Sequence, residues 1–241
     1  MTLSRRLVAE ALGTAFLLAA IVGSGIMATR LSGSNEGVAL LANTVVTGLA
    51  LMTLILTFSP ISGAHFNPVV TLLEAWQGKM AWREVPSYLA VQVIGACAGV
   101  AAVDVMFGLP VFSAATQVKS DWPQLWSEFV ATFGLIAVII GCSRRRSSVT
   151  PFAVAAYIVA ACWFTSSSSF ANPAATIARA MSNTFTGIRP VDVIGFIVAQ
   201  VMGASCAAVV FDWLFPSEGP VQAIVDVDKN VGRETDNRVI F

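Results

Sequence analysis

The sequence predicts an all-α integral membrane protein built from six transmembrane helices and two re-entrant half-helices. The first observation is composition: 56% of the 241 residues are hydrophobic and 12% are charged, whereas a soluble domain carries about 25% charged residues. The second is a series of six apolar runs, each close to the roughly 20 residues that a helix needs to cross a bilayer. The third is a pair of Asn-Pro dipeptides, which follow two of these runs and predict the half-helices.

The six spanning helices are predicted from apolar runs separated by breaks. The runs cover residues 7–29, 38–58, 86–107, 124–142, 151–168 and 190–214. Glycine and proline mark the breaks: Gly33 follows the first run, Pro110 closes the third, and Pro151 and Pro190 open the last two. The short basic segment 1–6 leads directly into the first run, which we interpret as a retained helix and not as a cleaved signal peptide.

Each Asn-Pro dipeptide predicts the start of a short helix. Asparagine is a preferred N-cap, and proline is favoured at the first helical position, where its missing N–H would be unpaired anyway. The helices that begin at Asn67-Pro68 and Asn172-Pro173 are predicted over residues 67–77 and 172–182, which is too short for a span. Broken backbone inside an apolar protein is tolerated where it lines a polar cavity, so the two breaks predict a pore.

The two halves of the chain resemble each other. Residues 7–16 align with residues 125–134, with Glu10 over Glu128. Each half holds three spans, an odd number, so the second half must enter the membrane in the opposite orientation to the first. An inverted repeat places the functional path at the interface of its halves. The predicted organisation is a first repeat over 1–110, a second repeat over 111–215 and a cytoplasmic tail over 216–241.

Basic residues near the ends of the spans predict the orientation. With the N-terminus inside, seven basic residues lie on the cytoplasmic side and four on the outer side. The triplet Arg144-Arg-Arg146 is the clearest single signal. We therefore expect both termini to be cytoplasmic.

Residue counts exclude several function classes. The formal net charge is zero, without the basic patch that nucleic-acid binding requires. His65 is the only histidine, so a zinc site or a histidine-based catalytic triad has too few residues. The four cysteines lie in apolar runs without Cys-x-x-Cys spacing, which is typical of small buried hydrophobic residues. We predict no enzyme activity, no metal and no cofactor.

The residues around the two breaks predict how the pore would work. The positive ends of both half-helix dipoles point at the same place, and the amides of Asn67 and Asn172 add hydrogen-bond donors there. A water molecule that directs its oxygen to both amides turns its hydrogens outward, which interrupts a proton-conducting chain, and cations are repelled from either side. The preceding loops, 63–66 and 168–171, would present backbone carbonyls to the path.

Two motifs resemble the signature loops of the major intrinsic protein family, the aquaporins and aquaglyceroporins. They are Ser62-Gly-Ala-His-Phe-Asn-Pro and Asn172-Pro-Ala, and the likeness covers about residues 5–215. The resemblance implies an aquaporin-like fold and a homotetramer in the lipid bilayer with one pore per subunit. It assigns the pore motifs to Asn67, Pro68, Val69, Asn172, Pro173 and Ala174. It assigns the pore-loop backbone to Gly63, Ala64, His65, Phe66, Phe170 and Ala171.

Glu10 and Glu128 are ionisable groups inside spans, which are costly unless they are partnered. The resemblance implies that each accepts hydrogen bonds from the backbone of one signature loop. The alternative is a proton relay in a coupled carrier, although no histidine or basic partner lies nearby in the sequence. Gln92 and Gln200 occupy matching places in the two halves and are interpreted as structural, and His65 is expected to pack beside its loop.

One position departs from the family's pattern. The residue after the second Asn-Pro-Ala is usually arginine, whereas here it is Ala175. The family's spacing assigns the other positions of the selectivity filter to Thr47, Ala160 and Ser169. All four side chains are small where narrow water channels have bulky ones, so we expect a wide filter that favours larger uncharged polar solutes. Val69, where the family has alanine, is expected to add bulk near the centre.

Arg179 follows Ala175 by four residues and therefore projects from the same helix face, one turn outward. Two positions stay open for its side chain: the outer mouth of the pore, or the lipid headgroups. Alanine at position 175 in place of the usual arginine, followed by Arg179, is a combination that resembles a bacterial subgroup of aquaglyceroporins found with arsenic-resistance genes. That resemblance implies passage of arsenite, an uncharged trihydroxide of the size of glycerol.

The expected function is a passive channel for small neutral solutes, namely water, glycerol and arsenite-type trihydroxides, in a bacterial inner membrane. A proton-coupled secondary carrier, a water-only channel and a membrane scaffold with a closed pore remain as alternatives.

Overall fold

The computed structural model describes residues 1–215, and the predicted tail 216–241 lies outside the described residues. Every regular element in the described part is a helix, which confirms the all-α prediction. The elements are α1 (Leu3–Leu31), α2 (Glu36–Ser62), α3 (Pro68–Trp76), η1 (Trp82–Glu84), α4 (Val85–Met106), α5 (Trp122–Arg145), η2 (Ser147–Val149), α6 (Thr150–Phe164), α7 (Pro173–Arg179), η3 (Pro190–Asp192) and α8 (Val193–Leu214).

Six of these helices are long and apolar enough to cross a membrane, which confirms the six predicted spans. Three boundaries differ from the prediction by four residues: α1 begins at Leu3 and not at residue 7, α2 ends at Ser62 and not at residue 58, and α6 ends before residue 168. Helix α2 continues through Pro60, which lacks only one backbone donor near the helix end, and stops at Gly63 with φ of 92°. Helix α6 ends at Phe164 and not at residue 168, because the backbone of Thr165 is extended, with φ of −111° and ψ of 138°.

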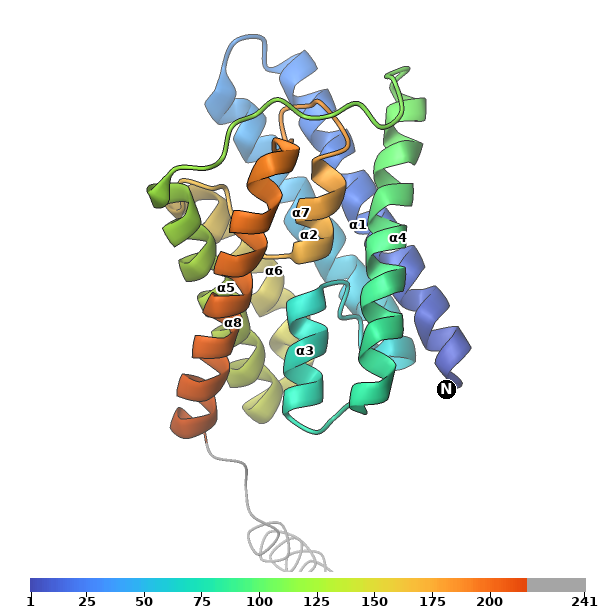
Figure 1. The fold of residues 1–241 in the computed structure, drawn as a ribbon, viewed down its shortest axis with the longest axis vertical. Helices are drawn as coiled ribbons and strands as arrows, with labels where there is room; N and C mark the ends of the chain where they lie inside the picture. The colour runs from blue at the N-terminus through green and yellow to red at the C-terminus, as the bar shows by residue number, and fades with distance from the viewer. Residues whose placement is uncertain (216–241) are drawn as a thin grey trace, which may run out of the picture.

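The half-helices α3 and α7 lie inside the ring of long helices, one toward each end of the molecule (Figure 1). Each packs against both α4 and α8, while α1 packs on α2 and α4, and α5 packs on α6 and α8. Contacts between α2 and α6 join the two groups. The N-terminus and the end of α8 lie at the same end of the molecule (Figure 1).

Glycines allow the closest helix pairs to form. A Cβ atom built on Gly95 of α4 would lie 2.3 Å from the carbonyl oxygen of Ala11 of α1, and one on Gly203 of α8 would lie 2.3 Å from that of Phe129 of α5. Small residues at such crossings let two backbones approach, which is how apolar helices gain packing energy in a membrane. Each glycine stands three residues after one of the matching glutamines, Gln92 and Gln200, so the same close packing occurs at equivalent positions of the two halves.

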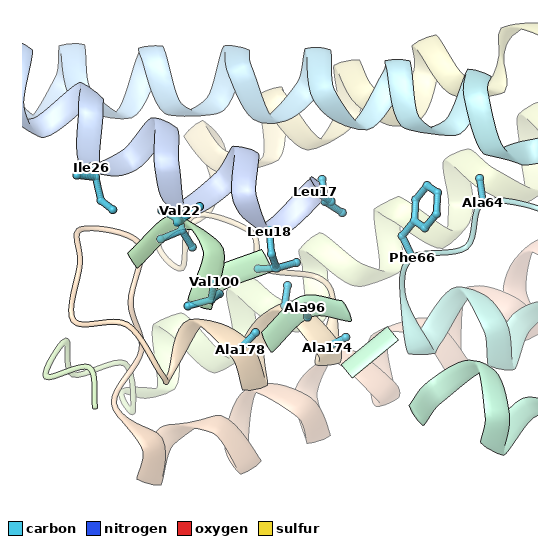
Figure 2. Packing of buried hydrophobic residues seen from close by; sticks show 12 residues of the cluster. Leu17, Leu18, Val22, Ile26, Ala64, Phe66, Ala96, Val100, Ala174 and Ala178 are labelled. Atoms are coloured by element: carbon cyan, nitrogen blue, oxygen red, sulfur yellow. The ribbon is translucent and has the colours of Figure 1, made fainter. Parts of the chain in front are cut away.

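A buried cluster fixes α7 against the first half of the chain. Leu18 and Val22 of α1 meet Val100 of α4 and Ala178 of α7, and all four side chains are buried (Figure 2). The Phe66 ring, which belongs to the loop before α3, occupies the space above Gly13 of α1, where a Cβ atom would lie 2.0 Å from it. Apolar packing alone therefore holds α7 and the loop before α3 against the first half of the chain.

Candidate pore

Both half-helices begin with the same capping geometry. The Oδ1 atom of Asn67 accepts from the N–H of Val69 at 3.1 Å, and that of Asn172 accepts from Ala174 and Ala175 at 3.0 and 3.2 Å. The following prolines take the first helical position. The helices are shorter than predicted, since α3 has nine residues and α7 has seven.

The two breaks are bonded to each other through these asparagines. The Nδ2 atom of Asn67 donates to the carbonyl oxygen of Ala171 at 2.8 Å, and that of Asn172 donates to the carbonyl oxygen of Phe66 at 2.8 Å. Each amide nitrogen carries two hydrogens, so one remains available to a molecule in the cavity that both side chains line.

Two buried carboxylates hold the loops that precede the half-helices. Glu10 accepts from the backbone N–H of His65 at 2.9 Å and of Phe66 at 2.7 Å. Glu128 accepts from the N–H of Phe170 at 2.8 Å and of Ala171 at 2.9 Å. Each glutamate thus binds two successive backbone N–H groups of one loop and fixes their orientation.

The loops need this support because their backbones are strained. Phe66 and Ala171 have φ angles of 49° and 46°, and Ala64 and Ser169 have φ angles of 52° and 45°. Left-handed conformations at residues other than glycine cost about 1–3 kcal/mol each and persist where the surroundings impose them. The matching positions of the strain, at the residue before each asparagine and two residues earlier, show that both loops are built alike.

A glutamine and a threonine complete each network. Gln92 donates to Glu10 and to Thr71 Oγ1, both at 2.9 Å. In the second half, Gln200 donates to Glu128 at 2.6 Å and to Thr176 Oγ1 at 2.9 Å. The two threonines were not predicted as site residues. Their signal in the sequence is that each follows its asparagine by four positions.

His65 lies beside its loop. Its Nδ1 atom is 3.0 Å from Thr71 Oγ1, and its ring centroid lies 5.3 Å from that of Tyr88. Within residues 1–215, no group of three or more His, Cys, Asp or Glu side chains is placed to hold a metal ion.

A cavity of about 450 Å³ runs past both asparagines. We call its two ends the α7 mouth and the α3 mouth. The α7 mouth is lined by Asn43, Lys119, Arg179, Phe185 and Thr186. The α3 mouth is lined by Glu74, Lys79, Ser143 and Thr150. The middle is lined by the predicted pore-loop residues Gly63, Ala64, His65, Phe66, Phe170 and Ala171.

Three of the four predicted filter residues line this cavity: Thr47, Ser169 and Ala175. Ala160 does not. It is exposed on the outside of the bundle, and α6 instead lines the cavity with Ile158 and Cys162.

The placement of Ala160 in the filter is therefore corrected. A Cβ atom built on Gly48 of α2 would lie 2.4 Å from Val159 Cγ2, so Val159 packs directly onto α2. This contact fixes the rotation of α6 about its axis. Ala160 stands two residues from both Ile158 and Cys162, on the opposite face of a helix with 3.6 residues per turn.

Val69 also differs from the expectation that it adds bulk near the centre. It is buried, yet it lines a separate apolar cavity of about 230 Å³ beside α8. The next residue, Val70, lines the main cavity. Pro68, Pro173 and Ala174 are buried as well and form the half-helix starts without lining the cavity.

Arg179 takes the position at the mouth and does not reach outward to the surface. Its side chain is buried, its Nε atom donates to the carbonyl oxygen of Thr186 at 2.5 Å, and its Cζ atom lies 3.3 Å from the centroid of the Phe170 ring. Lys119, which was not predicted, lies over the same ring at 5.5 Å. It belongs to the irregular segment between α4 and α5, where no periodic pattern marks it.

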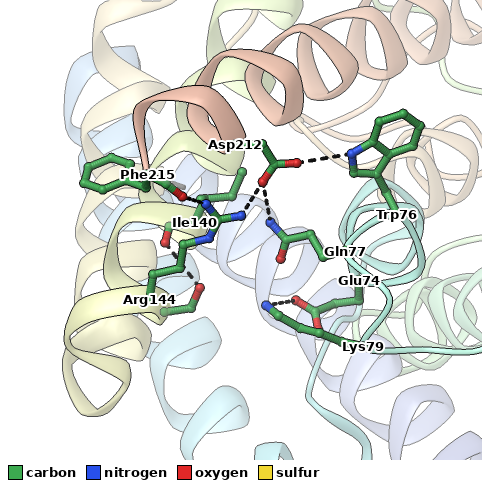
Figure 3. A network of polar contacts seen from close by, with 9 residues as sticks. Glu74, Trp76, Gln77, Lys79, Ile140, Arg144, Asp212 and Phe215 are labelled. Atoms are coloured by element: carbon green, nitrogen blue, oxygen red, sulfur yellow. Dashed lines mark hydrogen bonds and ion pairs between the residues drawn. The ribbon is translucent and has the colours of Figure 1, made fainter. Parts of the chain in front are cut away.

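A polar network anchors the end of α3. Asp212 of α8 accepts from Trp76 Nε1 at 3.2 Å and from Gln77 at 3.4 Å, and it pairs with Arg144 of α5 (Figure 3). The end of α7 has a corresponding contact, since Ser182 donates to Asp104 of α4 at 2.8 Å. Each half-helix is thus tied at its end by the carboxylate of a spanning helix from the other half.

Comparisons with known proteins agree with this architecture. The family model described as Major intrinsic protein matches residues 1–168 and 145–237. The chain is 47% identical over 219 residues to Aquaglyceroporin AqpS of Rhizobium meliloti (strain 1021), covering 91% of this chain and 94% of the relative. It is 34% identical over 230 residues to Aquaporin NIP1-3 of Oryza sativa subsp. japonica, covering 92% and 77%.

Among solved structures, the aquaglyceroporin from Plasmodium falciparum superimposes with a TM-score of 0.65. The match covers 94% of this chain and 100% of that one at 20% sequence identity. This likeness supports the arrangement of six spanning helices and two half-helices.

Proposed function

Since the chain belongs to the major intrinsic protein family, we propose that it is a passive channel for water, glycerol and other small uncharged solutes, including arsenite-type trihydroxides. One observation carries the proposal: a single cavity is lined by residues of both mouths and passes the paired amides of Asn67 and Asn172. No covalent chemistry is needed for this function: the middle of the cavity offers hydrogen-bonding groups and apolar walls, and charged side chains line the two mouths.

The small side chains at the filter positions support solutes larger than water. Thr47, Ser169 and Ala175 are small, and Cys162 completes the ring from α6. The hydroxyl of Ser169 is buried and has no protein partner in the described chain. Because an unpaired buried hydroxyl is costly, it favours a solute that carries hydroxyl groups of its own.

The asparagine pair supports exclusion of protons and cations. Both amides keep one hydrogen for the cavity, and the positive ends of α3 and α7 lie behind them. A water or solute oxygen is favoured there, whereas a cation faces donors only.

A proton-coupled carrier is the main alternative. It requires an acid that changes its partners with protonation, yet Glu10 already accepts from four donors and Glu128 from three. These hydrogen bonds commit both carboxylates to the loops, and neither Glu10 nor Glu128 lines the cavity, which disfavours them as a proton relay. The closed scaffold is disfavoured by the continuous lining of the cavity.

The proposal also covers the two repeats, the orientation of the protein in the membrane and its oligomeric state. Residues 1–110 and 111–215 form two inverted repeats, supported by the matched networks of Glu10 and Glu128. The α3 mouth faces the cytoplasm of a bacterial inner membrane with both termini, supported by the excess of basic residues on that side. The family resemblance supports a homotetramer.

Stopped-flow measurements on proteoliposomes test the function. Water, glycerol and arsenite are compared in parallel, with an imposed pH difference as a further condition. Flux should follow each solute's own gradient without saturating, because a preformed pore has no carrier cycle. Accumulation of a solute against its gradient would refute the channel.

A further inference from the structure

Two cations that form no ion pair in the described chain face the α7 mouth. Arg179 and Lys119 both line the cavity there, and both lie close to the Phe170 ring. The described chain contains four ion pairs, Arg6–Glu84, Lys79–Glu74, Arg144–Asp212 and Arg189–Asp192. Neither of the two cations takes part in them.

The carboxylates near this mouth have other partners. Asp192 accepts from Arg189 and from the backbone N–H of Lys119, and Glu128 accepts from the loop amides and Gln200. The side chain of Arg179 is only 8% exposed. A buried cation without a counter-charge is strongly unfavourable, so an anion that enters the mouth gains the attraction of both cations.

The mouth also offers unused donors. Arg179 donates only through Nε in the described chain, so its two Nη groups form no hydrogen bond there, and the residue lines the cavity. The hydroxyl of Ser169, 5% exposed, lines the same cavity and has no protein partner. A guanidinium fork matches the two oxygens of a planar anion, and a hydroxyl can bind a third oxygen.

We propose that the α7 mouth is a binding site for a small planar monoanion, of the nitrate or short-carboxylate class, held by the Nη groups of Arg179, the ammonium of Lys119 and the hydroxyl of Ser169. The anion stops there and obstructs the path of neutral solutes. Beyond the asparagines the wall is apolar, with Leu51, Leu135 and Ile139, and Lys79 at the far mouth is already paired with Glu74. A dehydrated charge has no favourable position in that half.

Binding can be measured without any assumption about solute flux. The probe is chloride, whose NMR signal broadens when it exchanges with a protein site, and nitrate is the competitor. The purified full-length protein should broaden the signal, and nitrate should reverse the broadening. Arg179→Gln should weaken nitrate binding by about tenfold or more, since it removes charge-assisted hydrogen bonds, and Lys119→Gln should weaken it less.

Arg30→Gln is the matched control. Arg30 also lies over a phenylalanine ring, that of Phe107 at 5.0 Å, but it is exposed and does not line the cavity. Its removal should leave the broadening unchanged. If Arg179→Gln folds poorly, Arg179→Lys and Lys119→Gln still test the site. Arg179→Lys keeps the charge and loses the fork, and Lys119→Gln changes only an irregular segment. Both should weaken nitrate binding.

The functional arm adds nitrate on the α7 side during glycerol flux. Flux through the native protein should fall, and flux through Arg179→Gln should not respond. Equal broadening in the native protein, Arg179→Gln and Lys119→Gln would overturn the site. A protein that binds nitrate and passes no solute would support the site and contradict the proposed channel.

Discussion

The side-chain amide of Asn172 donates to the carbonyl oxygen of Phe66 at 2.8 Å, across the boundary between the two halves. The reciprocal bond runs from Asn67 to Ala171. Each half-helix is therefore capped by its own asparagine and anchored to the strained loop of the other. Neither break can relax alone, which keeps the donors of both asparagines fixed at the centre of the cavity.

Replacing Asn172 with aspartate should damage this centre more than replacing it with serine. A carboxylate cannot donate to Phe66 and would face a carbonyl oxygen, and its charge would offset the positive ends of the half-helices. Asn172→Asp should lose about 3 kcal/mol of stability and admit cations. Planar-bilayer conductance compares the two variants. Equal cation conductance in two well-folded proteins would contradict the dipole account.

Glu128→Gln should destabilise the protein by about 3 kcal/mol. Its new amide would direct hydrogens at the N–H groups of Phe170 or Ala171, or at Gln200, all of which are donors. Thermal unfolding in detergent measures the loss, with Glu36→Gln, an exposed acid at the start of α2, as the control. If Glu128→Gln kept the stability of the native protein but lost a proton-driven uptake of solute, the result would favour the proton-coupled carrier.

The face that α6 presents to the cavity is tested by two substitutions of one kind. Cys162→Phe should obstruct the filter and reduce glycerol and arsenite flux by more than tenfold, because the added ring fills the space opposite Thr47 and Ser169. Ala160→Phe, on the exposed face, should leave flux close to native. A larger loss from Ala160→Phe, at matched protein insertion, would restore the sequence-based filter.

These two residues also show where sequence reasoning stops. Asn67, Asn172, Glu10 and Glu128 could be predicted because each occurs twice at matching places, and a repeat of an unusual polar residue in an apolar chain is a strong signal. The prediction that Ala160 belongs to the selectivity filter was wrong, because counting along a family's spacing does not reveal how a helix is rotated about its axis. That rotation depends on a tertiary contact, Val159 on Gly48.

Side-chain direction set a second limit. From the sequence, the side chain of Arg179 could be predicted to lie either at the mouth or at the lipid headgroups, since a long side chain can reach both from one helix position. The choice depends on the Phe170 ring and the Thr186 carbonyl, which lie in two loops with no periodic pattern. For the same reason Lys119, counted in the sequence only among the four basic residues of the outer side, was not predicted to line the mouth.

Anion binding at the α7 mouth should weaken as the pH rises. Burial and repulsion from Arg179 lower the pKa of Lys119 to about 8. The ammonium is therefore charged below about pH 8 and neutral above it, so chloride broadening should be larger at about pH 7 than at about pH 9. Lys119→Gln removes the titrating group and leaves the charged groups around it in place, namely Arg179, Arg189, Asp192, Glu128 and Asp121. Its broadening should not change over this range, and an undiminished pH response would assign the titration to another group.

The most demanding prediction concerns Ala175, which is 2% exposed and lines the cavity one turn before Arg179. Ala175→Arg would place a second guanidinium in the filter beside Thr47 and Ser169. Some stability should be lost, because a buried cation needs acceptors and Arg179 would repel it. Glycerol and arsenite should slow markedly and water less, since only the larger solutes need the space that the new side chain fills.

The double variant Ala175→Arg with Arg179→Ala separates the two effects. Removing Arg179 relieves the repulsion and leaves its acceptor, the Thr186 carbonyl, to the new guanidinium. The double variant should therefore recover stability relative to Ala175→Arg while keeping the narrow filter. The quantity to compare is the ratio of glycerol to water permeability, corrected for the amount of protein inserted. That ratio should fall in both variants, because the added volume lies at the constriction in each. An unchanged ratio in both would mean that Ala175 does not limit the path and that the constriction lies elsewhere along the cavity.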